Sequence, residues 1–138
     1  MKNKKDLQHI KIAYIGGGSR GWAWQLMRDL ATEKDISGEV ALYDIDYEAA
    51  QHNEIIGNRL KQRKDAVGKW DYKAYQTKKD ALTGADFVVI SIMPGTFDEM
   101  ASDVHLPEEY GIYQSVGDTA GPGGIVRALR TIPMMFEI

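Results

Sequence analysis

Cysteine is absent from this chain of 138 residues, which therefore forms no disulfide and holds no metal through a thiolate. Long apolar runs are absent too, and none approaches the length of a membrane span. The basic residues 1–5 are not followed by a signal-peptide core, because the apolar run at residues 10–15 is short and ends in glycine. From these absences we expect a cytoplasmic protein with no membrane partner.

A strong excess of charge is also lacking, because the formal net charge is −3. Domains that bind nucleic acid usually carry a clustered basic surface, so we expect no nucleic-acid partner. The three histidines, His9, His52 and His105, stand at no spacing from carboxylates that is typical of a metal site, and we predict no metal ligand in the chain. With 43% hydrophobic residues, the chain is long enough for one globular domain and too short for two.

Glycine, in contrast, is concentrated where an apolar segment ends. Residues 12–15 are predicted to form a strand that runs into Gly16, Gly18 and Gly21, which match the G-x-G-x-x-G pattern of dinucleotide-binding turns. The first glycine permits a tight turn, the second lets the backbone approach a pyrophosphate, and the third lets the following helix pack closely on the sheet. The N-terminus of that helix would add free N–H groups. The predicted cofactor contacts of this turn are Gly16, Gly17, Gly18, Ser19, Arg20 and Gly21.

Apolar runs and helical patterns alternate along the chain. The predicted strands are residues 12–15, 40–45, 72–77 and 87–93. The first, second and fourth are almost continuously apolar, as expected of parallel strands covered on both faces, whereas the third is more polar and suits a sheet edge. Helices between strands imply right-handed crossovers. We therefore predict an α/β fold with a doubly wound parallel sheet.

The faces of two helices are predicted from apolar spacing. In the helix after the glycine turn, the residues predicted to face the core are Trp22, Leu26 and Leu30. In the helix over residues 47–60, the corresponding stripe is Ala49, Ile56 and Leu60. Both stripes are expected to pack on the sheet.

An acid closes the second predicted strand. Asp44 lies 23 positions beyond Gly21, near where a carboxylate of a dinucleotide-binding domain accepts the ribose hydroxyls of NAD. Its charge would repel the extra phosphate of NADP, so NAD is the expected cofactor. Asp46 competes for this role but more naturally caps the next helix. The fourth strand ends at the same edge of the sheet, where further cofactor contacts are predicted from Met93, Pro94 and Gly95.

A second glycine cluster occupies residues 117–124 and precedes another helical pattern. The apolar positions of that pattern are Ile125, Leu129, Ile132 and Phe136. Two interpretations of the cluster stay open from the residues alone. It is either a helix-entry loop capped by Asp118 or Thr119, or a substrate-facing loop in which Asp118 does acid–base work.

Several of these segments together resemble one enzyme family. Residues 16–19, 42–46 and 116–124, the last followed by residues 127–130, are similar to the amino-terminal portion of family 4 glycoside hydrolases. Residues 103–108 and 111–116 resemble the α-galacturonidase branch of that family. The resemblance extends from about residue 11 to residue 138, and the loop Gly-Asp-Thr-x-Gly-Pro-Gly-Gly is its most specific element.

The resemblance implies a glycosidase that uses NAD and Mn²⁺. Enzymes of this family oxidise the sugar at C3, remove the C2 proton, eliminate the aglycone, add water and reduce the ring again. α-Galacturonides or related α-glycosides are then the expected substrates. Carried over by position, Asp118 is the general acid for the leaving group and Thr119 contacts the cofactor. The sugar side of the cleft is lined by Gly121, Gly123 and Gly124.

Three roles stay open for Arg20, which would pair with a phosphate, pair with a uronate carboxylate, or form a solvent-exposed corner of the turn. The family's metal ligands, a cysteine and a histidine, correspond to positions beyond residue 138, so Mn²⁺ is expected to be held outside this chain. Two alternatives to the glycosidase also stay open. They are an NAD-dependent hydroxy-acid or polyol dehydrogenase, and a non-catalytic NAD-binding module.

The resemblance also implies a domain organisation. Residues 1–10 are interpreted as an amino-terminal tail, and residues 11–138 as an incomplete NAD-binding Rossmann domain of the lactate/malate dehydrogenase type, truncated before the later strands. The carboxy-terminal catalytic part is then absent, so this chain alone is expected to be inactive. It should expose an apolar sheet edge and an apolar helix face. The full-length protein is expected to be a homo-oligomer.

Overall fold

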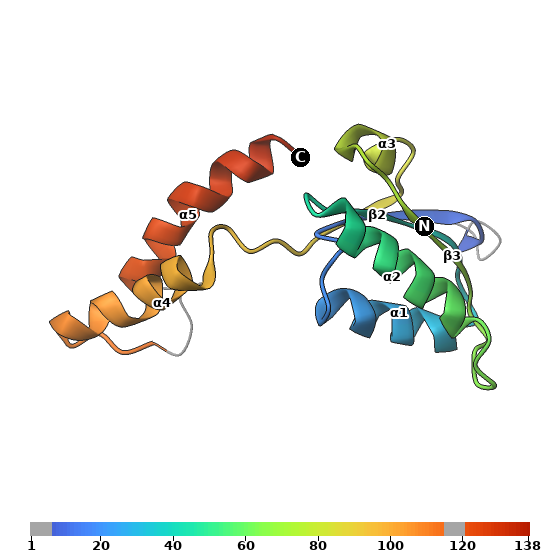
Figure 1. The fold of residues 1–138 in the computed structure, drawn as a ribbon, viewed down its shortest axis with the longest axis horizontal. Helices are drawn as coiled ribbons and strands as arrows, with labels where there is room; N and C mark the ends of the chain where they lie inside the picture. Colours follow the sequence, from blue (N-terminus) through green and yellow to red (C-terminus); the bar gives the residue numbers. More distant parts are fainter. Residues whose placement is uncertain (1–6, 115–120) are drawn as a thin grey trace. The chain divides into compact units, whose positions relative to one another are not determined.

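Two compact units, which divide between Ile92 and Met93, make up the structure (Figure 1). The structure is a computed structural model, and it describes residues 7–114 and 121–138. No helix of this described part is both long enough and apolar enough to cross a membrane.

The first unit is built on a parallel sheet. Its strands, in the order β3-β2-β1-β4, are β1 (Ile10–Ile15), β2 (Ser37–Tyr43), β3 (Lys69–Ala74) and β4 (Phe87–Ile90). Two helices, α1 (Trp22–Thr32) and α2 (Tyr47–Leu60), lie on one face, and α3 (Lys78–Leu82) lies on the other (Figure 1). The predicted doubly wound parallel sheet is thereby confirmed, and so is the edge position of β3.

The edge strand β3 begins three residues earlier than predicted, at Lys69 rather than residue 72. Its burial alternates strictly, with Trp70, Tyr72 and Ala74 buried and the intervening charged residues exposed. This period of two is the pattern of a strand with one face on the core. The polar side chains therefore form the solvent-exposed face of β3, and the strand begins at Lys69, before Tyr72.

The buried face of α1 is shifted by one residue from the predicted stripe. Trp22 begins the helix and is 75% exposed, and Leu26 is only half-buried. The buried residues of α1 that join the core are Ala23, Met27 and Leu30, which recur at i, i+4 and i+7, so Leu30 is the one member of the predicted stripe that is fully buried. The small side chain of Ala23 lets the start of α1 lie close to the sheet, where an indole would not fit.

The buried face of α2 also differs from the predicted stripe. The residues that are buried there are Ala50, Asn53 and Gly57. Of the predicted stripe, Ile56 is exposed, whereas Leu60 is half-buried and packs against the core as predicted. A Cβ on Gly57 would lie 2.5 Å from the ring of Tyr72, so the helix approaches β3 more closely than any side chain at this position allows. The face of α2 that is buried is therefore the one with small residues, which lets the helix lie close to β3, and not the one with the largest apolar side chains.

The expectation that β4 is covered on both faces is wrong. Phe87, Val88 and Ile90 are 58%, 47% and 41% exposed. β4 pairs with β1 alone among the described strands and ends the sheet on that side. The apolar composition of β4 thus produces an exposed apolar edge, which the sequence also predicted.

The second unit consists of α4 (Phe97–His105), the 3-10 helix η2 (Leu106–Tyr110) and α5 (Gly121–Phe136). α4 and α5 meet at Gly123, where a Cβ would lie 1.9 Å from the carbonyl oxygen of Asp103. The stripe that was predicted on α5 is exposed, which confirms the expected apolar helix face; it comprises Ile125, Leu129, Ile132 and Phe136.

An ion pair joins α4 to α5. Arg130 Nη2 donates a hydrogen bond to Asp103 Oδ2, and Arg130 Nε donates to the carbonyl oxygen of Pro94 at 3.3 Å. The Asp103 side chain is 3% exposed and that of Arg130 is 27% exposed. The guanidinium is therefore the partner that makes burial of this carboxylate tolerable.

The first turn of α4 carries a capping box formed by Thr96 and Glu99. Thr96 Oγ1 accepts from the N–H of Asp98 at 3.2 Å, and Glu99 Oε2 accepts from the N–H of Thr96 at 2.6 Å. Hydrogen bonds from the Thr96 side chain and backbone hold the pKa of Glu99 below its ordinary value. A carboxyl whose pKa is lower in the folded state stabilises the fold above its unfolded pKa, and this stabilisation is lost as the pH falls through the folded pKa.

We therefore expect the first turn of α4 to open as the pH falls below the ordinary glutamate pKa of 4.5. Glu99→Gln should remove most of this pH dependence, because glutamine does not titrate. Amide hydrogen exchange of α4, corrected for the intrinsic rates and followed from about pH 6 to about pH 3, measures the effect. Equal pH dependence in the two proteins would count against the capping role.

Candidate functional site

The order of the strands reverses at β1. The chain runs from β1 outward through β2 to β3 and then crosses back to β4 on the other side of β1. In open α/β sheets, ligands bind outside the carboxyl ends of the strands at such a switch point. Gly16 follows β1 there, and the N–H of Ser91, after β4, donates to the carbonyl oxygen of Ile15 at 2.8 Å. The glycine turn, residues 16–21, therefore lies where the fold favours a ligand.

The first two glycines of the turn are packed against backbone. Gly16 has a φ of +92°, and a Cβ there would lie 1.9 Å from the carbonyl oxygen of Ser91. The N–H groups of Gly16 and Gly17 both donate to the carbonyl oxygen of Tyr43, at 2.9 and 2.8 Å. A Cβ on Gly17 would lie 2.9 Å from that of Leu42. The chain can turn this tightly between β1, β2 and β4 only without side chains.

Asp44 lies against Gly18 of the turn. Its Oδ2 accepts from the N–H of Gly18 at 2.8 Å, and its Oδ1 accepts from the N–H of Asp46 at 3.0 Å. An ionised carboxylate accepts about four hydrogen bonds, so Asp44 retains capacity for two hydroxyls. Asp46 caps α2 by accepting from the N–H of Ala49 at 3.0 Å, which confirms the capping role predicted for it; the ribose contact of Asp44 stays a prediction.

The packing role predicted for Gly21 is wrong, whereas its predicted contact with the cofactor stays a prediction. A Cβ there would have no atom within 4 Å, so Gly21 does not allow close packing of the helix on the sheet. Close packing is found instead at Gly18, but against α2, because a Cβ there would lie 2.7 Å from the Cβ of Ala49. Gly21 instead forms the N-cap of α1 without a side-chain hydrogen bond, and the first turn of α1 carries no acid. The N–H groups and the positive dipole end of α1 are thus available to an anion.

Ser19 and Arg20 complete the turn. Ser19 donates its N–H to the carbonyl oxygen of Gly16 at 3.1 Å, and Arg20 is exposed. The guanidinium of Arg20 makes no hydrogen bond or ion pair that the described residues supply, so all three roles considered for it stay open.

The sequence analysis missed Asn53. Its side chain comes from α2, is 2% exposed and reaches the inner side of the glycine turn. Nδ2 donates to the carbonyl oxygens of Gly17 at 2.7 Å and Ser19 at 3.0 Å, while Oδ1 accepts from Nε1 of Trp24 at 2.7 Å. In the sequence, Asn53 stands at helical spacing between the small residues Ala50 and Gly57. It can be recognised as a buried amide only once these residues are known to form the buried face of α2.

The other predicted site residues belong to the second unit. Pro94 contributes the carbonyl oxygen bound by Arg130, and Gly95, at a φ of +102°, precedes the Thr96 cap of α4. Met93 stands before them. α5 begins at Gly121, which has a φ of +78° and is followed by Gly123 and Gly124. Asp118 and Thr119 lie outside the described residues, so the roles of these second-unit positions stay predictions.

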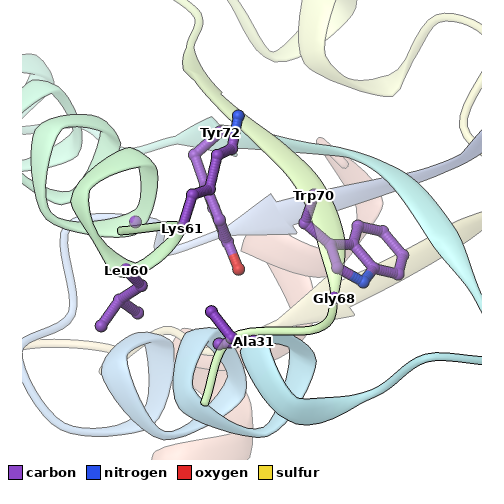
Figure 2. A pocket seen from close by; sticks show the side chains of 8 residues that line it. Ala31, Leu60, Lys61, Gly68, Trp70 and Tyr72 are labelled. Carbon is purple, nitrogen blue, oxygen red and sulfur yellow. The ribbon is translucent and has the colours of Figure 1, made fainter. Parts of the chain in front are cut away.

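Two hollows in the first unit do not match a dinucleotide. One, of about 10 Å³, is lined by Trp70 and Tyr72 of β3 and by the ends of α1 and α2 (Figure 2). It lies by the start of β3, at the opposite end of the sheet from the glycine turn, and suits no more than about one water. Trp70 Nε1 is buried nearby without a hydrogen-bond partner in the described part of the chain.

The other hollow, of about 490 Å³, is open and lies beside Tyr75. Lys11 and Lys73 place their ammonium groups 4.9 and 4.8 Å from the centre of the Tyr75 ring. Burial and a hydrogen bond to Glu39 at 2.8 Å raise the pKa of Tyr75 to about 12. These side chains are engaged with one another, and we assign no ligand to this hollow.

Residues 7–114 and 121–138 contain no cluster of side chains that could bind a metal ion. No group of three or more His, Cys, Asp or Glu side chains there is placed to hold an ion. His105 contacts Glu108, with 3.1 Å between Nδ1 and Oε2, and no third ligand joins them. The described residues fit an anionic cofactor at the glycine turn and do not fit Mn²⁺.

Comparisons with known proteins agree with this geometry. The family described as family 4 glycosyl hydrolase matches residues 11–138. An α-galacturonidase of Thermoanaerobacterium saccharolyticum is 74% identical over 129 residues, which are 94% of this chain and 28% of that protein. The chain thus spans little more than a quarter of the length of this relative.

Solved structures of glycosidases contain a part that is similar in fold to this chain. A proposed glucosidase from Bacillus subtilis superposes with a TM-score of 0.83 at 60% identity, over 95% of this chain and 29% of that one. A 6-phospho-β-glucosidase from Thermotoga maritima, solved with manganese, NAD⁺ and glucose 6-phosphate, gives a TM-score of 0.71 at 30% identity, over 94% of this chain and 30% of that one.

Proposed function

The chain belongs to the family 4 glycosyl hydrolases, and from this membership we propose that it supplies the NAD-binding part of a longer glycosidase that acts on α-galacturonides. The relative that is 74% identical is an α-galacturonidase, which supports the choice of substrate class. The observation that carries the proposal is the glycine turn itself. Its first three residues, 16–18, are packed too tightly for side chains, it leads into an uncapped helix, and it lies against the carboxylate of Asp44.

In this proposal the pyrophosphate of NAD lies beside the glycine turn, at the start of α1. The N–H groups of residues 16–18 are already bonded to Tyr43 and Asp44, so the uncapped N–H groups and the dipole of α1 are what favour a doubly charged diphosphate. Asp44 accepts hydrogen bonds from the two ribose hydroxyls, and its charge repels the extra phosphate of NADP.

When bound, NAD supplies reversible hydride transfer at C3 of the sugar, which acidifies the C2 proton and allows elimination of the aglycone before water is added. In this scheme Asp118 protonates the leaving group, and Thr119 lies on the nicotinamide side. Gly121, Gly123 and Gly124 border the sugar. The Mn²⁺ ligands would be the cysteine and histidine that the family resemblance assigns to positions after residue 138.

A chimaera tests the proposed activity. This chain replaces the matching residues of the Thermoanaerobacterium saccharolyticum α-galacturonidase, and hydrolysis of p-nitrophenyl α-galacturonide is followed with and without NAD in the presence of Mn²⁺. We expect hydrolysis that requires NAD from the chimaera and none from the 138-residue chain alone. A folded chimaera that hydrolyses nothing, or a chain that is active alone, would contradict the proposal.

Asp44→Ala tests the cofactor assignment. We expect binding of NAD to weaken about tenfold, which is about 1.4 kcal/mol, because the ribose hydroxyls lose their acceptor. Binding of NADP should weaken less, so the preference for NAD narrows. Calorimetric titration of both nucleotides measures the two affinities.

Asp46→Ala is the matched control for Asp44→Ala. It removes a carboxylate two residues away and the cap of α2, at a cost of about 1 kcal/mol in the free energy of unfolding. The ratio of the NAD and NADP affinities should stay at the wild-type value. A ratio that shifts equally in the two variants would show that Asp44 does not contact the ribose.

A further inference from the structure

We propose that Asn53 is a positioning residue that sets the shape of the glycine turn, and that Trp24 holds Asn53 in the orientation this requires. The inference rests on the proposed NAD site for the identity of the ligand. The shape of the turn, in contrast, follows from hydrogen bonds that are present without any ligand. Asn53 touches neither NAD nor sugar in this account and acts only through the backbone of residues 17–19.

The orientation of the Asn53 amide is fixed by its partners. Two of them are carbonyl oxygens, of Gly17 at 2.7 Å and of Ser19 at 3.0 Å, and both need a donor. The third is the indole N–H of Trp24, at 2.7 Å, which needs an acceptor. Only one placement of the side-chain NH₂ and oxygen satisfies all three, so the amide cannot flip without losing every bond.

These bonds determine where the N–H groups of the turn point. In a planar trans peptide the C=O of one residue and the N–H of the next point in opposite directions. Drawing the Ser19 carbonyl toward Asn53 therefore directs the N–H of Arg20 away from α2. Drawing the Gly17 carbonyl inward likewise directs the N–H of Gly18 to the Asp44 carboxylate, which it reaches at 2.8 Å.

The position of Asn53 also argues for this role. It lies in the middle of the buried face of α2, between Ala50 and Gly57, and is 2% exposed. A buried amide is unfavourable unless its polar atoms are bonded. An apolar residue here would leave the carbonyl oxygens of Gly17 and Ser19 without donors. The side-chain amide of Asn53 therefore stabilises the glycine turn by hydrogen bonding.

Asn53→Asp tests the inference directly. Aspartate has nearly the same shape but no NH₂, so it would turn a carboxylate oxygen toward the two carbonyl oxygens. We expect about tenfold faster hydrogen exchange of the Gly17 and Gly18 amides and about tenfold weaker NAD binding. Exchange is measured by NMR on the 138-residue chain, and NAD binding by calorimetry.

Asn58→Asp is the matched control on the same helix. Asn58 Nδ2 donates to the carbonyl oxygen of Tyr72 at 2.8 Å, and its Oδ1 accepts from the N–H of Tyr72 at 3.2 Å. The substitution is chemically identical and also breaks a bond to backbone, but the backbone is that of β3. We expect a comparable loss of stability, with unchanged NAD affinity and unchanged exchange at Gly17 and Gly18.

Trp24→Phe decides the question if Asn53→Asp does not fold. It keeps a ring in place and removes only the N–H that holds Asn53 Oδ1, so we expect about threefold faster exchange at Gly17 and Gly18. Trp22→Phe on the exposed side of α1 should leave that exchange unchanged.

The inference is overturned if the amides of Gly17 and Gly18 exchange no faster in Asn53→Asp than in the control Asn58→Asp. It is likewise overturned if they exchange no faster in Trp24→Phe than in the control Trp22→Phe. It is also overturned if Asn53→Asp binds NAD as tightly as the wild type. A wild-type chain that does not bind NAD defeats the proposed function, while the exchange comparison still decides the role of Asn53.

Discussion

Gly16→Ala is expected to lower the free energy of unfolding of the first unit by about 3 kcal/mol or more. The new Cβ would lie 1.9 Å from the carbonyl oxygen of Ser91, which is backbone and has no rotamer to escape into. The φ of +92° is also unfavourable for alanine. Because β1 and β4 meet at this point, the substitution separates the two strands that frame the site. Urea unfolding followed by circular dichroism measures the loss.

Gly21→Ala is the control for this prediction. It makes the same change at the other end of the turn, where a Cβ meets nothing within 4 Å and where φ is −103°. We expect a change within about 0.5 kcal/mol. Similar losses at the two glycines would contradict the account of the turn, since that account assigns the tight packing to its beginning and not to its end.

Arg130→Met is expected to destabilise the second unit by about 3–5 kcal/mol. Methionine keeps most of the length of the side chain but leaves the Asp103 carboxylate, 3% exposed, without its partner. The carbonyl oxygen of Pro94 also loses a donor. Amide hydrogen exchange of α4 and α5 in the whole chain reports the loss, because both helices belong to the second unit.

Arg127→Met, one turn earlier on α5, is the matched control. Nη1 of Arg127 is buried without a hydrogen-bond partner among the described residues, so the same substitution there removes packing and a poorly satisfied group but no ion pair. We expect a loss of about 1 kcal/mol or less. If α5 exchanges equally fast in both variants, the ion pair does not hold the second unit together.

The order of the strands and the place of the glycine turn were predictable because local signals agree there. An apolar run, three glycines and an acid at the end of the next strand all indicate one supersecondary unit. The helix faces were not predictable in the same way. The sequence shows large apolar residues such as Trp22 and Ile56, but burial on α1 and α2 is decided by how closely the backbones approach, which favours Ala23 and Gly57.

Asn53 shows a second limit of sequence reasoning. An asparagine on a helix is ordinarily a surface residue, and its importance here depends on two carbonyl oxygens more than 30 positions earlier in the chain. Gly21 shows the converse, because it matches the motif and yet has open space around it. A motif gives the spacing of a turn, whereas the three-dimensional packing decides which of its glycines are obligatory.

The central claim is that NAD is held at the glycine turn of this chain. The most direct test is an NMR titration of the ¹⁵N-labelled chain with NAD up to about 10 mM, a range that detects Kd values near 1 mM, or about −4 kcal/mol. The account predicts shifts at residues 16–21, Asp44 and Ser91, with smaller shifts for NADP at the same concentrations. Signals of the glycine turn that stay unmoved at the highest NAD concentration, or shifts confined to other parts of the sheet, would contradict it.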